Sequence, residues 1–228
     1  MHYIDLTHNI HEQIPLWPGS LPFSIKVRQQ YSPRKFRVYD YHLAAGTGTH
    51  LDAPFHCKEK GKSVAEFSLN QLIGPGCVID VSEKVQTNPD YVITAEDIEC
   101  WEKLYGKIAP KSIVIAHTGW SQYWPQPQRY CNADAQGVLH FPGFGEAAAR
   151  LLVTRDILGV GIDTLSLDPG NSQTYAAHHV FLGSQLFQLE NLANTAVLPA
   201  IDATIFVLPL KIEQAPEAPA RVFAMLVS

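Results

Sequence analysis

The stretch that organises the chain reads Gly46-Thr47-Gly48-Thr49-His50-Leu51-Asp52-Ala53-Pro54-Phe55-His56. Side chains alternate between two faces along an extended segment, so His50 and Asp52 are expected to share one face. An imidazole nitrogen beside a carboxylate oxygen suits a divalent cation such as zinc. The glycines permit close backbone approach, and Pro54 redirects the chain so that His56 leaves the strand. The alternative is a surface turn with two ordinary histidines, but this density of ligands and backbone breakers favours a site.

Length and composition predict one domain that spans residues 1–228. Of the 228 residues, 46% are hydrophobic and 17% are charged, which is enough apolar material for a sizeable core. The formal net charge is -5, and no run of lysine or arginine occurs, so neither nucleic acid nor an anionic membrane is an expected partner. No apolar run approaches the ~20 residues of a membrane span. Residues 1–10 lack an apolar signal core, and the four cysteines form no Cys-x-x-Cys, so a cytoplasmic protein with reduced thiols is expected.

The pattern of apolar residues predicts an α/β fold with a mixed sheet. Strands are predicted at residues 3–7, 24–30, 36–45, 77–81, 112–116, 158–162, 184–189, 203–208 and 221–227. Helices are predicted at residues 67–73, 94–105, 144–155 and 175–183. The strand–helix–strand–helix–strand order from Cys77 to Ile162 implies a parallel βαβαβ core with right-handed crossovers.

Three segments are predicted to be irregular. Gly74-Pro75-Gly76 is expected to end a helical turn, and residues 215–219 to form a hairpin-like loop between the last two strands. Residues 121–143 contain three prolines and are expected to form a long loop, which is often functional in a compact domain. Together with Trp17, which lies among prolines and forms either a lid on the core or a pocket wall, this loop is expected to determine substrate choice.

Polar residues also follow two predicted strands, at 117–120 and 163–170, where ligands bind in open α/β sheets. Further along the chain, His178 and Glu190 are natural remote partners for the pair at positions 50 and 52. His179 is adjacent to His178 and would point elsewhere on a helix, and spacing alone does not choose between them. Glu190 follows an apolar strand and could be a ligand, a general base or a solvated strand end, the last being the commonest for a lone carboxylate.

Taken together, these segments resemble the cyclase / kynurenine formamidase family of metal-dependent amidohydrolases, which includes the isatin hydrolases. The family motif H-x-G-T-H-x-D-x-P-x-H corresponds to residues 46–56. Further similar blocks are Asp5-Leu6-Thr7-His8, Pro15-Leu16-Trp17-Pro18-Gly19, Thr118-Gly119-Trp120, Phe141-Pro142-Gly143 and Gly161-Ile162-Asp163-Thr164-Leu165-Ser166-Leu167-Asp168. The family's H-x-x-L-L-G block with a downstream E-x-L is matched by His178-His179-Val180-Phe181-Leu182-Gly183 and Glu190-Asn191-Leu192. The likeness covers nearly the whole chain.

The resemblance implies roles for individual residues. The metal ligands that it implies are His50, Asp52, His178 and Glu190. Asp52 would be able to bridge two ions, and His178 rather than His179 stands in the ligand position. His56 would be the catalytic histidine, and Trp17 would line the substrate pocket. The family further implies one or two zinc or manganese ions, a swivelling β/β/α-type fold and a homodimer or larger homo-oligomer.

One position departs from the family motif. Its first histidine, a metal ligand in the family, is Gly46 here, and glycine has no donor side chain. His42 lies four residues earlier, about 13 Å away along an extended strand, so it cannot simply replace that ligand. Three outcomes are open, ranked in this order: a one-metal hydrolase, a two-metal hydrolase in which water or another residue fills the gap, and an inactive metal-binding protein.

The expected activity is hydrolysis of a C–N amide bond in an aryl formamide or a cyclic amide. A bound metal lowers the pKa of water from 15.7 to about 7, which makes hydroxide available at neutral pH. His56 would transfer a proton to the leaving nitrogen, and Glu190 could act as the base if it is not a ligand. The alternative activity is hydrolysis of a lactone or ester, because the same chemistry attacks esters. In either case the expected partner is a small-molecule substrate.

Overall fold

The computed structural model describes residues 1–32 and 35–226. The strands are β1 (His2–Asp5), β2 (Ser24–Gln29), β3 (Val38–His42), β4 (His50–Asp52), β5 (Ile73–Asp80), β6 (Val92–Ile93), β7 (Ile113–His117), β8 (Gly143–Phe144), β9 (Gly159–Ile162), β10 (Phe187–Glu190), β11 (Ala203–Pro209) and β12 (Glu217–Leu226). The α-helices are α1 (Leu69–Leu72), α2 (Ser82–Thr87), α3 (Ala95–Tyr105), α4 (Pro127–Cys131), α5 (Glu146–Val153) and α6 (Ala176–Gly183). The 3₁₀ helices are η1 (Pro54–His56), η2 (Val64–Glu66), η3 (Trp120–Tyr123) and η4 (Thr195–Val197). Among the described residues, no helix combines the length and apolar character that a bilayer crossing requires.

Seven strands close into a mixed barrel in the order β12-β11-β5-β7-β9-β10-β4, and β4 then pairs with β12. Strands β5, β7, β9 and β10 run parallel to their neighbours in this series. Strands β4, β11 and β12 are joined antiparallel, and β1 continues the sheet beyond β12. The predicted mixed α/β fold is confirmed. Its closure into a barrel was not predicted, because closure depends on β4 pairing with two strands from the second half of the chain.

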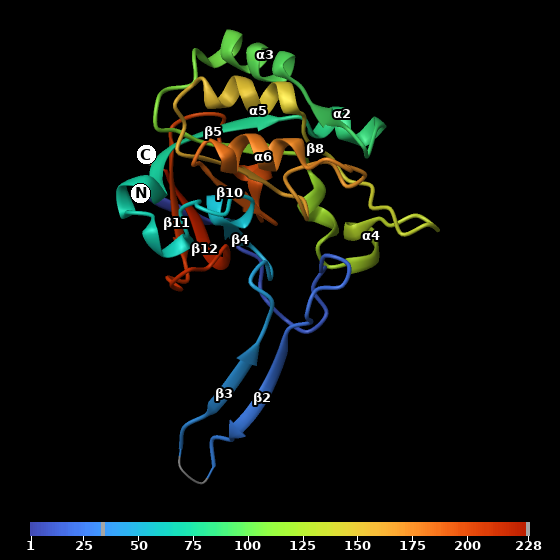
Figure 1. Cartoon of the computed structure of the whole chain (residues 1–228), viewed down its shortest axis with the longest axis vertical. Coiled ribbons are helices and arrows are strands. Elements are labelled where there is room, and N and C mark those ends of the chain that lie inside the picture. The colour runs from blue at the N-terminus through green and yellow to red at the C-terminus, as the bar shows by residue number, and fades with distance from the viewer. Residues whose placement is uncertain (33–34, 227–228) are drawn as a thin grey trace.

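Alternating side chains divide the core into two layers. Along β7, Ile113 and Ile115 belong to the cluster inside the barrel, whereas Val114 and Ala116 belong to the cluster outside it. The outer cluster packs beneath the helices, and Figure 1 shows α3, α5 and α6 together on one side of the sheet. Gly159 on β9 is required by this packing, since a Cβ there would lie 2.4 Å from the Phe187 ring.

The helical turn predicted within residues 67–73 is confirmed as α1, but the prediction that Gly74-Pro75-Gly76 are irregular is wrong, because these residues belong to β5. Residues 73–76 pair with β11, and pairing with β7 begins only at Gly76. Gly74 fits this crowded place because a Cβ there would lie 2.6 Å from the carbonyl oxygen of Lys111. The glycines here serve close packing between strands, rather than a turn.

The prediction of an irregular segment over residues 121–143 is partly confirmed, since η3, α4 and β8 occupy parts of it whereas residues 132–142 lie outside every helix and strand. Pro127 takes the first position of α4, where its missing N–H costs nothing, and Asn132 ends that helix in the left-handed conformation. The predicted loop over residues 215–219 is partly strand, because β12 begins at Glu217 and pairs there with β4. The last predicted strand, 221–227, is confirmed as part of β12, and Val227 lies outside the described residues.

Strands β2 and β3 form a two-stranded arm that extends away from the barrel (Figure 1). Ile25 lies opposite Tyr41 and Val27 lies opposite Tyr39, so these four side chains share one face of the arm. Ile25, Val27 and Tyr41 are 43%, 46% and 60% exposed. The arm therefore presents an apolar face to solvent, and β3 is shorter than the strand predicted over residues 36–45.

Candidate active site

Strand β4 lies between β10 and β12 and holds the centre of the candidate site. His50 is opposite Glu190 of β10, and Asp52 is opposite Gln188 of β10 on one side and Glu217 of β12 on the other. Leu51 packs inside the barrel, so His50 and Asp52 point together to the outer face, as the sequence predicted. The three neighbouring strands thus bring an imidazole and three carboxylates to one face.

The carboxylates and imidazoles meet at short distances. His50 Nε2 lies 3.3 Å from Asp52 Oδ1 and 3.3 Å from Glu190 Oε2. His178 Nε2 lies 3.2 Å from Glu190 Oε1 and 3.7 Å from Asp52 Oδ2. All four side chains are at least nine-tenths buried. The structure therefore brings together the four residues that the sequence predicted as metal ligands.

His178 is oriented from α6 by a carboxylate behind it. Its Nδ1–H donates to Asp168 Oδ2 at 2.6 Å, and Asp168 also accepts hydrogen bonds from the backbone N–H groups of Ala177 and His178. With Nδ1 protonated, Nε2 presents its lone pair toward Asp52 and Glu190. His179, the next residue, is exposed. The geometry thus supports the choice of His178 over His179.

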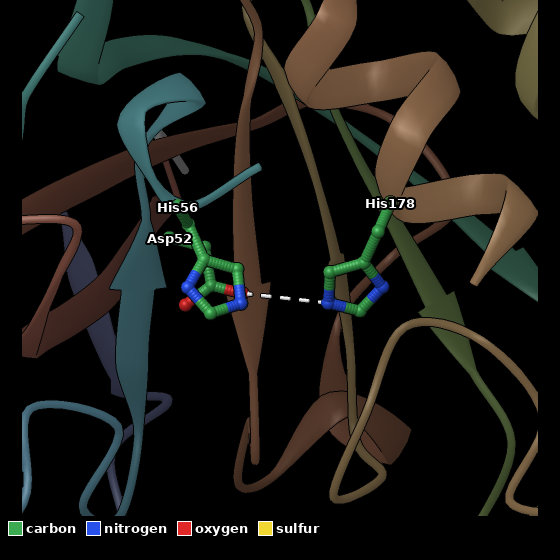
Figure 2. Close-up of side chains that lie close together, drawn as sticks. All are labelled: Asp52, His56 and His178. Atoms are coloured by element: carbon green, nitrogen blue, oxygen red, sulfur yellow. Dashed lines mark ion pairs between the residues drawn. The ribbon is translucent and has the colours of Figure 1, made fainter. Parts of the chain in front are cut away.

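His56 lies in η1, at the open side of the cluster. Figure 2 shows the Asp52 and His56 side chains facing His178, which approaches from α6. The ring centroids of His56 and His178 are 6.1 Å apart, and His56 Nδ1 lies 3.7 Å from Glu217 Oε1. The His56 side chain is 35% exposed, whereas that of His178 is 8% exposed. His56 therefore reaches both the buried cluster and the solvent-filled space.

The electrostatics of the cluster favour positive charge at its centre. Burial opposes protonation of His50, but Asp52 and Glu190 outweigh burial and raise the His50 pKa well above its usual value. Burial likewise opposes charge on His178, and Asp168, Asp52 and Glu190 nevertheless raise its pKa. Burial would raise the pKa of Asp52, but the two buried histidines hold that pKa below its usual range. The carboxylates thus create a negative potential that a cation would satisfy.

The donor set fits a divalent metal ion. Two groups of ligand atoms lie within 4.8 Å of one another, namely His50, Asp52 and Glu190, and Asp52, His56 and His178. Asp52 belongs to both groups, which suits a bridging ligand. Among the described residues, Asp52 Oδ1 is buried without a hydrogen-bond partner. Ligand atoms bound at about 2.0–2.1 Å around a tetrahedral zinc ion are about 3.3 Å apart, similar to the spacing of the first group.

Comparisons with known proteins identify the family of this chain. The Cyclase family model matches residues 4–169. The chain belongs to the Cyclase family.

Isatin hydrolase of Roseibium aggregatum is 32% identical over 193 residues, which cover 81% of this chain and 73% of the relative. Kynurenine formamidase of Geobacillus thermodenitrificans is 30% identical over 221 residues, covering 96% of this chain and 95% of that protein. A crystal structure of an isatin hydrolase bound to the product analogue thioisatinate is 28% identical with a TM-score of 0.92, covering 99% of this chain and 92% of that one. The resemblance predicted from the sequence is confirmed.

The Cyclase-family site opens into a cavity of about 380 Å³. Trp17 lies in its wall, as predicted, and its ring meets Tyr175 edge-on with centroids 6.3 Å apart. The remaining lining residues are Ser20, Ala44, Gly46, His50, Asp52, His56, Cys57, Leu165, Ser166, His178, His179, Glu190 and Glu217. Among the described residues, none from 121–143 lines this cavity, so the prediction that this segment shapes the substrate site is not supported by the structure.

Residues 117–123 instead border a second cavity of about 680 Å³. Of the two polar clusters predicted at strand ends, only 163–170 reaches the candidate site, through Leu165, Ser166 and Asp168. Sequence reasoning gave Asp168 no role, although its place after a strand end was a usable signal. It missed Glu217 altogether, because that residue lies in a proline-rich segment that was interpreted as a loop.

Proposed function

We propose that this protein is a divalent-metal-dependent hydrolase that cleaves a C–N amide bond in an aryl formamide or a cyclic amide. The observation that carries the proposal is the buried cluster in which His50 and His178 turn their Nε2 atoms toward the carboxylates of Asp52 and Glu190. The names of the two relatives support the bond type, since kynurenine formamidase and isatin hydrolase both denote cleavage of an amide nitrogen attached to an aromatic ring.

One or two divalent ions would be held by His50, Asp52, His178 and Glu190. Zinc or manganese is proposed, because imidazole nitrogen and carboxylate oxygen are donors that suit both. When bound, such an ion supplies a Lewis acid and makes hydroxide available at neutral pH. The second imidazole nitrogen of each histidine is engaged by a fixed acceptor, with His50 Nδ1 donating to the Gly48 carbonyl oxygen at 2.8 Å. These bonds hold both rings in the orientation that ligation requires.

His56 is proposed as the proton carrier. It faces the cavity, is the most exposed imidazole of the cluster, and lies close to Glu217 rather than to a fixed backbone acceptor. It is therefore free to take a proton from solvent or water and give it to the leaving nitrogen. Glu190 is proposed as a ligand rather than a base, because its Oε1 already accepts a hydrogen bond from the Leu167 N–H at 2.8 Å.

Trp17 and Tyr175 are proposed to hold the aromatic part of the substrate. Trp17 is 37% exposed and Tyr175 is 39% exposed, and both border the cavity. Aromatic rings in edge-to-face or offset stacks gain about 0.5–1.5 kcal/mol beyond their buried area. Such a wall favours an aryl amide over an aliphatic one.

The test is metal analysis of the purified full chain, followed by assays with N-formyl anilines, isatin and aryl lactones in the presence of zinc or manganese. We expect turnover of the formamide or cyclic amide that is lost in the Asp52→Asn variant. Preferential turnover of the lactones would instead establish an ester hydrolase. A metal-loaded protein that turns over none of these compounds would support an inactive binding protein and would contradict the proposal.

Several wider features are also proposed. A second copy of this chain would cover the apolar face of the β2–β3 arm, which gives a homodimer or larger homo-oligomer, since an isolated two-stranded hairpin is only marginally stable in water. Residues 1–228 would form one domain with the family's swivelling β/β/α arrangement, and the parallel pairing of β5, β7 and β9 supports a βαβαβ core within it. A cytoplasmic location is proposed, in keeping with four free cysteines.

A further inference from the structure

The Glu217 carboxylate borders the space that a side chain at position 46 would occupy. A Cβ built on Gly46 would be 3.2 Å from Glu217 Oε1 and 3.2 Å from His50 Nε2. These two atoms therefore face the same small volume beside Gly46. This is the position at which the family motif carries histidine, so the space that the absent imidazole leaves is bordered by a carboxylate from another strand.

The pairing of β12 with β4 points the Glu217 side chain toward this space. Glu217 is directly opposite Asp52 in the antiparallel pairing of β12 with β4, and residues opposite one another have side chains on the same face. The following residue, Ala218, is fully buried inside the barrel, which fixes the direction of Glu217 toward the outside. The Glu217 side chain is 24% exposed, and its ion-pair partner is His56 at 3.7 Å.

A second observation at the same place calls for a ligand. Asp52 Oδ1 is the carboxylate oxygen on the His50 side, 3.3 Å from His50 Nε2. It is buried and has no hydrogen-bond partner within the part of the chain that the structure describes. His50 Nδ1 donates to the Gly48 carbonyl oxygen, so in the neutral ring the Nε2 lone pair faces the same volume. A cation between these atoms would satisfy both.

We propose that Glu217 is a metal ligand that replaces the side chain missing at Gly46, so that His50, Asp52 and Glu217 hold a second ion beside the one held by Asp52, His178 and Glu190. This inference rests on the proposed function. Glu217 lies outside the two groups whose atoms are all within 4.8 Å. Its three rotatable side-chain bonds let an oxygen close the remaining gap, which a side chain at the solvent edge of the cavity is free to do.

The replacement changes the chemistry of this position. A carboxylate oxygen in place of an imidazole nitrogen makes the donor set harder and adds one negative charge. Carboxylate-rich sites suit manganese better than do sites rich in imidazole, which suit zinc. The position served by Glu217 is therefore expected to accept manganese more readily than an otherwise equal position with a histidine at residue 46 would.

The experiment measures ion binding in the full chain, without substrate. After removal of metal with a chelator, manganese is added and free Mn²⁺ is followed by its electron paramagnetic resonance signal. We expect two ions per chain in the wild type. We expect one unchanged ion in Glu217→Ala and Glu217→Gln, with the second bound at least about 100-fold more weakly, because loss of a direct ligand should exceed the ~10–100-fold effect of losing an outer partner. Glu213→Ala removes an exposed carboxylate from the same β11–β12 connection and should bind as the wild type does.

A double variant tests replacement directly. Gly46 does not have a positive φ, and the atoms nearest to its built Cβ belong to the side chains of Glu217 and His50, so Gly46→His requires a shortened Glu217 and a shift of the His50 ring by a few tenths of an ångström. Gly46→His combined with Glu217→Ala should restore the second ion and shift its preference from manganese toward zinc. Urea unfolding in chelator shows whether each variant is folded.

Unchanged affinity and stoichiometry in folded Glu217→Ala would overturn the assignment, and would leave Glu217 as a neighbour of His56 only. The result is independent of the substrate assays. A wild type that binds two manganese ions, loses one in Glu217→Ala and hydrolyses nothing would contradict the proposed function while upholding the ligand role.

Discussion

At the scale of single residues, the proposed role of His56 is proton transfer, whereas the proposed role of Asp168 is to orient the ligand His178. His56 is a side chain of the open cavity, whereas Asp168 lies behind His178 and does not line the cavity. Replacing one should change catalysis alone, and replacing the other should change metal affinity. These two expectations separate the roles.

For His56→Ala, we expect turnover to fall by about 10²–10⁴-fold, the usual contribution of a positioned proton carrier, with the metal content unchanged. Metal analysis and steady-state kinetics on the same preparation provide the measurement. His11→Ala, which removes an exposed imidazole, is the control and should behave as the wild type. Loss of metal from His56→Ala would show that His56 is a ligand, as its membership of one candidate ligand group allows.

For Asp168→Asn, we expect metal affinity to weaken by about 10–100-fold. The amide would place an NH₂ group against N–H donors of Ala177 and His178 that now point at carboxylate oxygens, so His178 would lose its fixed orientation. Metal titration gives the affinity, and a melt in chelator reports any separate loss of fold. Asp202→Asn, at an exposed position with positive φ that asparagine tolerates, is the matched control. Equal affinities in the two variants would contradict the orienting role.

The residues of the site differ in how far the sequence could predict them. His50, Asp52 and His56 lie in one short motif, and their shared face follows from strand periodicity alone. His178 and Glu190 were candidates from the sequence, but the choice of His178 over His179 and the ligand role of Glu190 required the resemblance, because spacing alone does not decide either. Glu217 could not be predicted, since its role depends on the register of β12 against β4, which no local pattern encodes.

At the scale of elements, helix α3 is tied to the segment after α5 by one buried carboxylate. Glu102 accepts hydrogen bonds from Arg155 Nε at 2.7 Å and Nη2 at 2.9 Å, and it also pairs with Lys107. The paired Arg155 guanidinium lowers the Glu102 pKa to about 2, because its effect outweighs that of burial, which raises the pKa. The fork-like pairing fixes the direction as well as the strength of the contact.

For Glu102→Gln, we expect the free energy of unfolding at pH 7 to fall by about 2 kcal/mol. Because the folded-state pKa lies below the unfolded value of 4.5, this contribution is complete above about pH 4.5 and is lost as the pH falls toward 2. Urea unfolding at pH 7 and at pH 3 should therefore show a difference from wild type that shrinks on acidification. Glu99→Gln on the exposed face of the same helix should cost little at either pH, and an equal cost for both variants would refute the assignment.

Element boundaries were predictable where local chemistry sets them. Helix α3 begins after Thr94, whose hydroxyl accepts from the Asp97 N–H while the Asp97 carboxylate accepts from Thr94, and it ends at Gly106 with φ of 91°. Both the capping box at Thr94 and Asp97 and the terminal glycine can be recognised in the sequence. The start of β5 at Ile73 was not predictable, because the glycines there serve contacts with other strands rather than a local turn.

At the scale of the whole molecule, the β2–β3 arm has an apolar face that the described residues of a single chain leave exposed. Its apolar face alternates with a polar face on which Lys26 lies opposite Asp40. A ribbon with one apolar face and no covering layer is typical of a contact between subunits. The sequence predicted an oligomer only through the resemblance, whereas the arm gives that prediction a physical location.

For Val27→Lys combined with Tyr41→Lys, we expect the proposed oligomer to dissociate into monomers. The two lysines would place charge in the proposed interface, where the side chains they replace are 46% and 60% exposed in the single chain. Size-exclusion chromatography with light scattering at micromolar concentration measures the mass. Lys26→Gln on the opposite face should leave the mass of the wild-type assembly unchanged. A wild type that is already monomeric would rule out the homo-oligomer.

The closure of the barrel also depends on strands that are synthesised at different times. His50 and Asp52 emerge from the ribosome early, but their neighbours on both sides, β10 and β12, emerge late. Until β12 pairs with β4, the nascent chain exposes one edge of β4. A chain truncated before β12 is therefore expected to keep an open sheet edge that invites aggregation. The strand that carries His50 and Asp52 is thus covered on both edges only after residues 217–226 have been made.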